Sequence, residues 1–125
     1  MHVFGLGNDI IEIERVRRFV EKFTDRCIGR IYTLAEWNYC WSQGNPFASL
    51  AVRFAAKEAV LKALGVGISA SLSLTSVEVY NNALGAPNIH LDLKASALLS
   101  QKGGRQVSVA LSHCRTFASA VAVIV

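Results

Sequence analysis

Residues 53–64 read Arg53-Phe54-Ala55-Ala56-Lys57-Glu58-Ala59-Val60-Leu61-Lys62-Ala63-Leu64, and this stretch decides the fold. Its alanine and leucine content predicts a helix that lies inside the structure. Small side chains recur at every fourth position and form a stripe along which another backbone can approach closely: Ala51, Ala55, Ala59 and Ala63. Gly65 suits the left-handed cap that ends such a helix, and Gly67 lets the backbone pass close to a neighbour.

Four charged residues occupy this predicted helix. Arg53 and Lys57 share one face, and Glu58 and Lys62 share another, in each case four positions apart. Charges within packed structure cost several kcal/mol unless they are paired or ligated, so the group is consistent with binding of a polyanion or a metal. Ordinary salt bridges along the helix, such as Glu58 with Lys62, are worth about 0.2–0.5 kcal/mol each and are the alternative explanation of these charges.

The composition indicates one folded domain over residues 1–125. The chain is 52% hydrophobic, which is enough for a core and high enough to favour an oligomer with a buried interface. Its formal net charge of +4 favours an acidic or phosphate-bearing partner. No repeat, low-complexity tract or linker divides the sequence.

The cysteines and the apolar segments bear on location. Cys27, Cys40 and Cys114 are odd in number and lack CxxC spacing, so neither a disulfide framework nor a zinc site is indicated. The N-terminal residues do not match a signal peptide, and the apolar segment Ala118–Val125 is too short to cross a bilayer. We therefore expect a soluble cytoplasmic protein without a membrane partner.

The remaining chain predicts an α+β fold, with a largely antiparallel sheet packed against the long central helix. Asp9 lies near the end of a first strand that begins at Val3, and His113 lies at the tip of a final hairpin. Other expected elements are a helix from Ile13, a short helix after the capping box Thr33-Leu34-Ala35-Glu36, a loop over 42–49, strands over 74–80 and 88–93, a helix over 94–101, and strands over 106–112 and 117–125.

The helix after Ile13 has a basic stripe beside an apolar one. Val16, Phe19, Val20 and Phe23 follow the helical period, and the neighbouring stripe is formed by Arg15, Arg18, Lys22 and, if the helix extends that far, Arg26. Such a ridge is typical of a surface that docks an acidic amphipathic helix. A solvated helix face explains the same spacing.

Several motifs, taken in order, resemble the bacterial holo-acyl-carrier-protein synthases: 5–16, GLGNDIIEIERV; 30–36, RIYTLAE; 53–59, RFAAKEA; 62–68, KALGVGI; and 109–113, VALSH. The resemblance implies a 4′-phosphopantetheinyl transferase fold assembled as a homotrimer, with active sites at subunit interfaces. It also implies transfer of the phosphopantetheine arm of coenzyme A to a serine of apo acyl carrier protein, for fatty acid biosynthesis.

The resemblance assigns roles to individual residues. Asp9 and Glu58 match the ligands of Mg²⁺, which binds together with the coenzyme A pyrophosphate, and Lys62 matches a residue that assists departure of the leaving phosphate. Either Glu58 or a metal-bound water takes the proton of the carrier serine. The positions near coenzyme A are Arg53, Lys57, Lys62, Gly65, Gly67 and His113, and those that dock the carrier protein are Arg15, Arg18, Phe19, Lys22 and Arg26.

A basic binding module without catalysis is the alternative, with nucleic acid or an acidic protein as its partner. Nucleic-acid binders interleave aromatic residues with a stronger excess of positive charge. Here only Phe19 and Phe23 accompany the basic stripe, and both belong to the apolar face of the helix. The residues therefore favour the transferase and disfavour nucleic acid.

Overall fold

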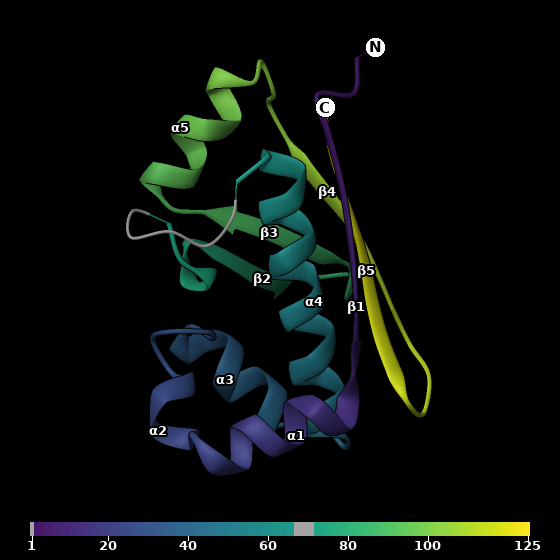
Figure 1. Cartoon of the computed structure of the whole chain (residues 1–125). Helices are drawn as coiled ribbons and strands as arrows, with labels where there is room; N and C mark the ends of the chain where they lie inside the picture. Colours follow the sequence, from purple (N-terminus) through teal and green to yellow (C-terminus); the bar gives the residue numbers. More distant parts are fainter. Residues whose placement is uncertain (1, 67–71) are drawn as a thin grey trace.

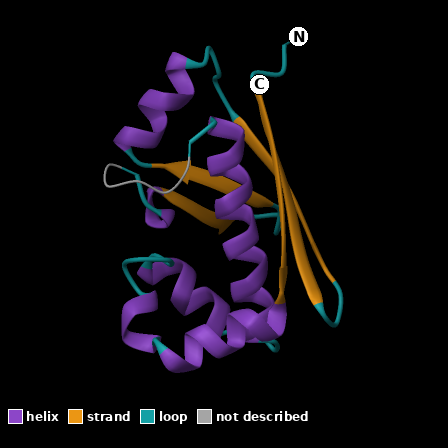
Figure 2. Ribbon diagram, in the orientation of Figure 1, coloured by secondary structure: helices purple, strands orange, loops and turns teal. Residues whose placement is uncertain are grey.

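The computed structural model describes residues 2–66 and 72–125 of the chain. All three strand pairs within these ranges are antiparallel, and helices flank them (Figure 2), so the predicted α+β class is confirmed. In chain order the elements are β1 (Gly5–Glu12), α1 (Ile13–Lys22), α2 (Thr24–Cys27), α3 (Leu34–Trp41), α4 (Pro46–Leu64), the 3₁₀ turn η1 (Leu74–Ser76), β2 (Val77–Asn81), β3 (Pro87–Leu91), α5 (Leu93–Gln101), β4 (Val107–His113) and β5 (Phe117–Ile124).

The strands form a three-stranded sheet in the order β1-β5-β4 and a two-stranded sheet of β2 and β3. Helix α4 runs beside β1 and β5, with α1, α2 and α3 gathered at its N-terminal end (Figure 1). No helix of the described ranges is both long enough and apolar enough to span a membrane.

Helix α4 and strand β1 are in direct backbone contact. A Cβ atom built on Gly7 would lie 2.0 Å from the carbonyl oxygen of Ala59, and one on Gly5 would lie 2.1 Å from that of Ala63. The facing side of β5 also carries small buried residues: Ala118, Ala120 and Ala122. The predicted role of the alanine stripe in close approach is thus confirmed.

The start of α4 corrects the prediction of a loop over residues 42–49. The helix begins at Pro46. A proline is favoured in the first turn because the N–H groups there have no partner within the helix, so its missing N–H costs no hydrogen bond. The side chain of Asn45 caps the helix by accepting a hydrogen bond from the backbone N–H of Ala48 at 3.2 Å. At the other end, Gly65 adopts φ 77°, the left-handed cap expected from the sequence.

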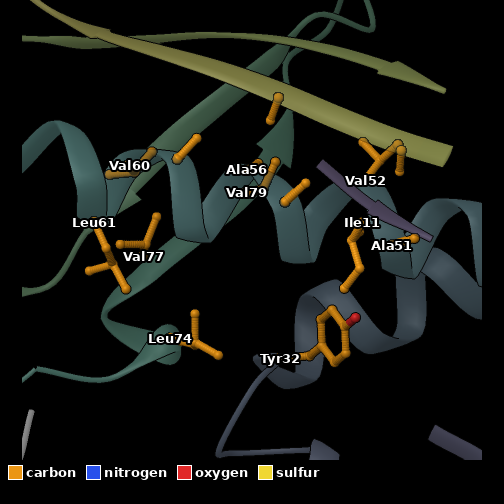
Figure 3. Packing of buried hydrophobic residues seen from close by; sticks show 14 of the residues in the cluster. Ile11, Tyr32, Ala51, Val52, Ala56, Val60, Leu61, Leu74, Val77 and Val79 are labelled. Atoms are coloured by element: carbon orange, nitrogen blue, oxygen red, sulfur yellow. The ribbon is translucent and has the colours of Figure 1, made fainter. Parts of the chain in front are cut away.

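Apolar side chains surround α4 on most sides and join both sheets into one core (Figure 3). Tyr32, the largest side chain that is fully buried, packs between α3 and α4, and its hydroxyl donates to the carbonyl oxygen of Leu50 at 2.7 Å. A helix that is apolar all round lies inside a structure, so α4 holds whatever polar groups it carries in fixed positions.

Two smaller differences concern boundaries that the sequence left uncertain. Helix α1 ends at Lys22, and Arg26 belongs to the separate short helix α2. His113 is the last residue of β4, one position before the turn at which it was expected.

The predicted capping box is confirmed, since Thr33 Oγ1 accepts from Glu36 N at 3.2 Å and Glu36 Oε1 accepts from Thr33 N at 2.9 Å.

Candidate active site

Asp9 and Glu58 line one pocket of about 580 Å³, although they come from β1 and α4. Asp9 lies opposite Ala120 on the sheet face that packs on α4, and its side chain is only 17% exposed. Glu58 is half-buried on the helix that this sheet covers. The volume is that of a pocket for a small molecule, so two acids distant in sequence share one open pocket.

Lys62 lies beside the two acids, one helical turn after Glu58. Its ammonium donates to Asp9 Oδ1 at 3.1 Å and to the carbonyl oxygen of Asn8 at 2.9 Å. This pairing corrects the interpretation of Glu58 and Lys62 as a salt bridge within the helix. Because β1 lies directly against α4, the ammonium reaches across to the strand.

The electrostatics of the pocket act mainly on Glu58. Burial raises the pKa of the Glu58 carboxyl, the negative charge of Asp9 raises this pKa further, and the ammonium of Lys62 lowers it in part. Two acids with one neighbouring cation leave an excess of negative charge. The part of the pocket formed by these two carboxylates therefore attracts a proton or a metal cation, although three arginines line the same pocket.

This donor set fits Mg²⁺. That ion takes oxygen ligands and is typically held by one or two carboxylates, with waters and substrate phosphates completing its octahedron. The described ranges contain no group of three or more His, Cys, Asp and Glu placed to hold a metal. A cation bound here would thus rely on Asp9 and Glu58 and on oxygen atoms supplied by a substrate and by solvent.

Three of the five residues predicted to dock a carrier protein border the same pocket: Arg15, Phe19 and Arg26. The other two do not line it. The side chain of Arg18 is 79% exposed and lies 4.0 Å from Glu14, and Lys22 lies over the Phe23 ring. The structure thus places positive charge next to the acids and leaves Arg18 and Lys22 on the outer surface.

The pocket also contains Arg30 and Phe54, to which the sequence analysis gave no role. Phe54 precedes Glu58 by four positions, so the helical period was a signal that could have identified it. Its ring lies 5.8 Å from that of Phe19. Arg30 follows α2 in a segment without helical periodicity, and although it begins the motif at 30–36, that motif assigned it no role.

A second, smaller hollow of about 270 Å³ brings together Arg53 and His113. Arg53 comes from α4 and His113 from the end of β4, and uncharged residues, both polar and apolar, complete the lining, among them Ser49 and Val52. Neither acid of the larger pocket lines this hollow. Of the two glycines expected near a cofactor, Gly65 caps α4, and Gly67 lies outside the described residues.

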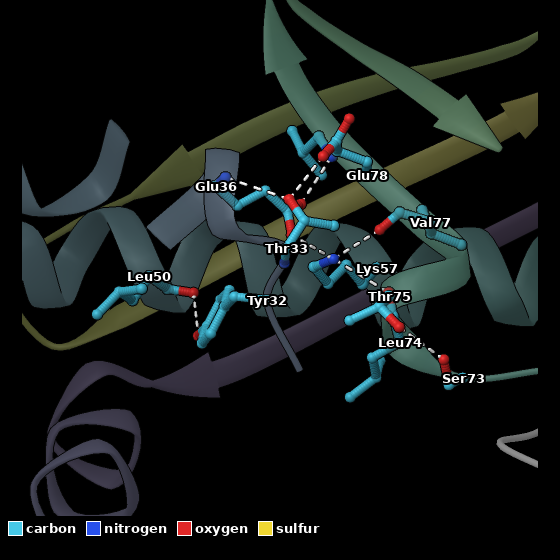
Figure 4. A network of polar contacts seen from close by, with 11 residues as sticks. Tyr32, Thr33, Glu36, Leu50, Lys57, Ser73, Leu74, Thr75, Val77 and Glu78 are labelled. Carbon is cyan, nitrogen blue, oxygen red and sulfur yellow. Dashed lines mark hydrogen bonds and ion pairs between the residues drawn. The ribbon is translucent and has the colours of Figure 1, made fainter. Parts of the chain in front are cut away.

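The structure corrects the predicted position of Lys57 near coenzyme A. Its side chain is fully buried, and its ammonium lies 2.6 Å from Glu36 Oε1 and donates to the carbonyl oxygens of Leu74 and Val77 (Figure 4). All three donor positions are used inside the fold. Lys57 therefore cannot contact coenzyme A, and it joins α3, α4 and the start of β2.

Comparison with known proteins decides the family. The model of the 4′-phosphopantetheinyl transferase superfamily matches residues 5–122. The chain belongs to the 4′-phosphopantetheinyl transferase superfamily. This family assignment confirms the resemblance seen in the sequence, and the match extends from β1, which carries Asp9, to β5.

Named relatives of this transferase cover nearly its full length. The holo-[acyl-carrier-protein] synthase of Chlamydia muridarum is 46% identical over 121 residues, which are 97% of this chain and 94% of that protein. The crystal structure of the synthase from Neisseria meningitidis has a TM-score of 0.88, 34% identity and 98% coverage of both chains. The Helicobacter pylori synthase in complex with coenzyme A has a TM-score of 0.83 and 31% identity, covering 96% of this chain and 99% of that one.

Proposed function

We propose that the chain, as one domain over residues 1–125, transfers the 4′-phosphopantetheine group of coenzyme A to a serine of apo acyl carrier protein. The other product is adenosine 3′,5′-bisphosphate, and the modified carrier serves fatty acid biosynthesis. The observation that carries the proposal is the convergence of Asp9 and Glu58 on one pocket that Arg15 and Arg26 border. The names of the relatives and the coenzyme A complex of one of them support the choice of substrates.

Asp9 and Glu58 are the proposed holders of Mg²⁺, which when bound would offset the charge of the coenzyme A pyrophosphate. Lys62 has its ammonium 3.1 Å from Asp9 and is half-exposed, so it can turn from Asp9 to the leaving phosphate. A cation placed at that oxygen stabilises the negative charge that develops as the phosphate departs. His113 and Arg53 lie in the separate hollow, where they offer positive charge and donors to another phosphate of the coenzyme.

Glu58 is the proposed proton acceptor for the carrier serine. Glu58 lines the pocket at which the serine is proposed to dock. Burial and the charge of Asp9 raise the pKa of its carboxyl while no cation is bound, and Mg²⁺ held by the same carboxylate would lower this pKa. Asp9 instead accepts a hydrogen bond from the Lys62 ammonium at 3.1 Å. Phe19 and Phe54 cover one wall of the pocket and limit access of water to the serine.

The carrier protein is proposed to dock on the basic side of this pocket. Arg15, Arg26 and Arg30 present positive charge around the apolar ring of Phe19, which complements an acidic amphipathic helix. Arg18 and Lys22 lie farther out on the same helix and extend the positive field that steers the carrier to the pocket. The docked serine would then face Asp9 and Glu58.

A homotrimer is proposed as the working assembly. The sheet face opposite α4 carries large apolar side chains with little charge: Leu6 is 68% exposed, Ile10 65% and Val121 43%. These residues stand on the same face, because Leu6 pairs with Val123 and Asn8 with Val121 in the β1–β5 register. An apolar face of this kind is typical of a subunit interface, and its position beside the pocket supports active sites shared between subunits.

The test uses the purified chain with coenzyme A, Mg²⁺ and an apo carrier protein. Mass spectrometry should show a carrier that has gained one phosphopantetheine group, and chelation of the metal should prevent the gain. Asp9→Asn and Glu58→Gln keep the size of each side chain and remove its charge, so each variant should lose at least about 100-fold in rate. Transfer by either variant at the parent rate would refute the assignment of the two acids.

A further inference from the structure

Arg53 is a buried cation without a counter-ion. The residue is 5% exposed, and within residues 2–66 and 72–125 no carboxylate oxygen lies within 4.0 Å of its guanidinium. Its Nε is buried and has no hydrogen-bond partner in those ranges. Lys57, one turn later on the same helix and fully buried, has Glu36 at 2.6 Å. Burial of an unpaired charge is costly, so the fold leaves a positive charge available to a ligand.

The partners of Arg53 orient its guanidinium without neutralising it. Asn81 Oδ1 accepts a hydrogen bond from Nη2 at 2.6 Å, and the ring of Tyr39 lies 4.3 Å from the guanidinium carbon. Ser49 Oγ accepts a weaker bond from Nη1 at 3.4 Å. All three partners are uncharged. A guanidinium has five N–H donors, so several stay free for an anion in the hollow that Arg53 shares with His113.

Asn81 is itself held in one orientation. Its Nδ2 donates to the carbonyl oxygen of Gly85 at 2.8 Å, which directs Oδ1 at Arg53. The same turn is fixed by Asn82, whose Oδ1 accepts from the N–H groups of Leu84 and Ala86, both at 3.0 Å. The turn between β2 and β3 therefore determines where the Arg53 guanidinium lies.

We infer that Tyr39 and Asn81 are positioning residues that hold the Arg53 guanidinium ready for a phosphate group of coenzyme A. The inference rests on the proposed function. Tyr39 supplies an aromatic face and Asn81 a fixed oxygen, and both restrict the Arg53 side chain before the ligand arrives. Binding then costs less conformational entropy than it would for a freely moving arginine. An acidic partner at either position would orient Arg53 equally well but would cancel its attraction for phosphate. The neutrality of both partners is the property that makes this a ligand site.

The test compares Tyr39→Leu and Asn81→Ala with two matched controls. Tyr39→Phe keeps the aromatic face, and Leu84→Ala changes a side chain that is 95% exposed on the same turn and leaves the hydrogen bonds of Asn81 and Asn82 in place. KM is measured for coenzyme A and for the carrier protein, and Kd for coenzyme A is measured by calorimetry. Each of the first two variants should raise KM and Kd for coenzyme A roughly tenfold. The KM for the carrier protein, kcat and Tm should stay near the parent values, and both controls should resemble the parent.

Dephospho-coenzyme A, which lacks the ribose 3′-phosphate, identifies the phosphate. If Tyr39→Leu and Asn81→Ala lose affinity for coenzyme A but not for dephospho-coenzyme A, Arg53 binds the 3′-phosphate. If they lose affinity for both compounds equally, Arg53 binds the pyrophosphate. Unchanged coenzyme A binding in Tyr39→Leu and Asn81→Ala would overturn the inference, as would equal losses in the controls or a fall in Tm and kcat together. A parent protein that binds coenzyme A but modifies no carrier would count against the proposed function alone.

Discussion

Glu58 is the residue at which stability and activity oppose each other. Burial and the charge of Asp9 raise the pKa of its carboxyl, so the folded chain binds this proton more tightly than the unfolded chain does. Stability therefore falls as the pH rises through the window between the unfolded pKa and the raised folded pKa. Above that window the folded chain carries the full cost of an ionised Glu58.

We expect Glu58→Gln to raise the melting temperature in metal-free buffer at neutral pH. Glutamine has nearly the same shape as glutamate and carries no charge, so the cost of the ionised carboxyl disappears. The gain should shrink as the pH falls through the folded pKa of Glu58 and should vanish below the unfolded pKa, where the carboxyl is uncharged in both states. Calorimetry of both proteins over a pH series measures the difference, and a gain that is independent of pH would contradict the prediction.

Substitution of Lys57 tests how much the buried ion pair between Lys57 and Glu36 contributes to stability. Lys57→Met should lower the free energy of unfolding by about 3–5 kcal/mol, because it leaves Glu36 buried without its cation. Lys62→Met, at the half-exposed cation of the same helix, should change it by about 1 kcal/mol or less. Chemical denaturation measures both values. If the two variants were equally stable, the ion pair would have no structural role.

Adding Glu36→Gln to Lys57→Met should recover part of the lost stability, since no unpaired charge then stays in the core. Recovery will be incomplete because Glu36 also accepts from the N–H groups of Thr33 and Val79, at 2.9 and 2.7 Å. A glutamine can replace at most one of these two accepted bonds. The interaction energy from the double-mutant cycle isolates the contribution of the pair.

At the scale of elements, the contact between β1 and α4 depends on glycine. Gly7→Ala should lower the free energy of unfolding by more than about 3 kcal/mol, because its Cβ would lie 2.0 Å from a backbone oxygen of α4. Neither β1 nor α4 can move apart to relieve this clash without disturbing the packing of the core around them. Gly44→Ala is the control, since a Cβ there meets nothing within 4 Å. Denaturation midpoints compare the two, and a mild effect at Gly7 would show that β1 can shift away from α4.

Substitutions on helix α1 test where the carrier protein docks. Arg15→Glu should raise KM for the carrier protein by roughly tenfold at low salt, because it reverses a charge at the pocket wall. Arg18→Glu, on the exposed side of the same helix, should have a smaller effect. Both effects should weaken with added salt, which screens exposed charges. A change in KM for coenzyme A instead would remove Arg15 from the docking surface.

The sequence predicted most of the elements because their signals are local. The first strand, the capping box at Thr33 and the glycine cap at Gly65 each depend on neighbouring residues. The predicted position of Asp9 near the end of that strand was wrong, because β1 continues to Glu12. The sequence missed the partners that the fold brings together from a distance. Lys57 looked like a ligand contact because its partner Glu36 lies on another helix, and Asn81 received no role because its link to Arg53 exists only after β2 packs beside α4.

At the scale of the whole molecule, the apolar outer face of the three-stranded sheet predicts association. Leu6→Lys, on that face, should reduce the mass measured by light scattering from that of three chains to that of one. Transfer activity should fall with it if subunits share the active site. Leu84→Lys is the control, because Leu84 is 95% exposed on the turn between β2 and β3. A parent protein of monomeric mass would refute the trimer.

Helix α4 carries Arg53 towards one hollow and Glu58 towards the other pocket while its neighbours bury it on nearly every side. Inserting or deleting one residue between these positions would rotate the rest of the helix by about 100°. The alanines that face Gly5 and Gly7 would then be replaced by larger side chains, and the two sites would lose their alignment. This segment can therefore diverge among relatives by substitution but not by a change in length.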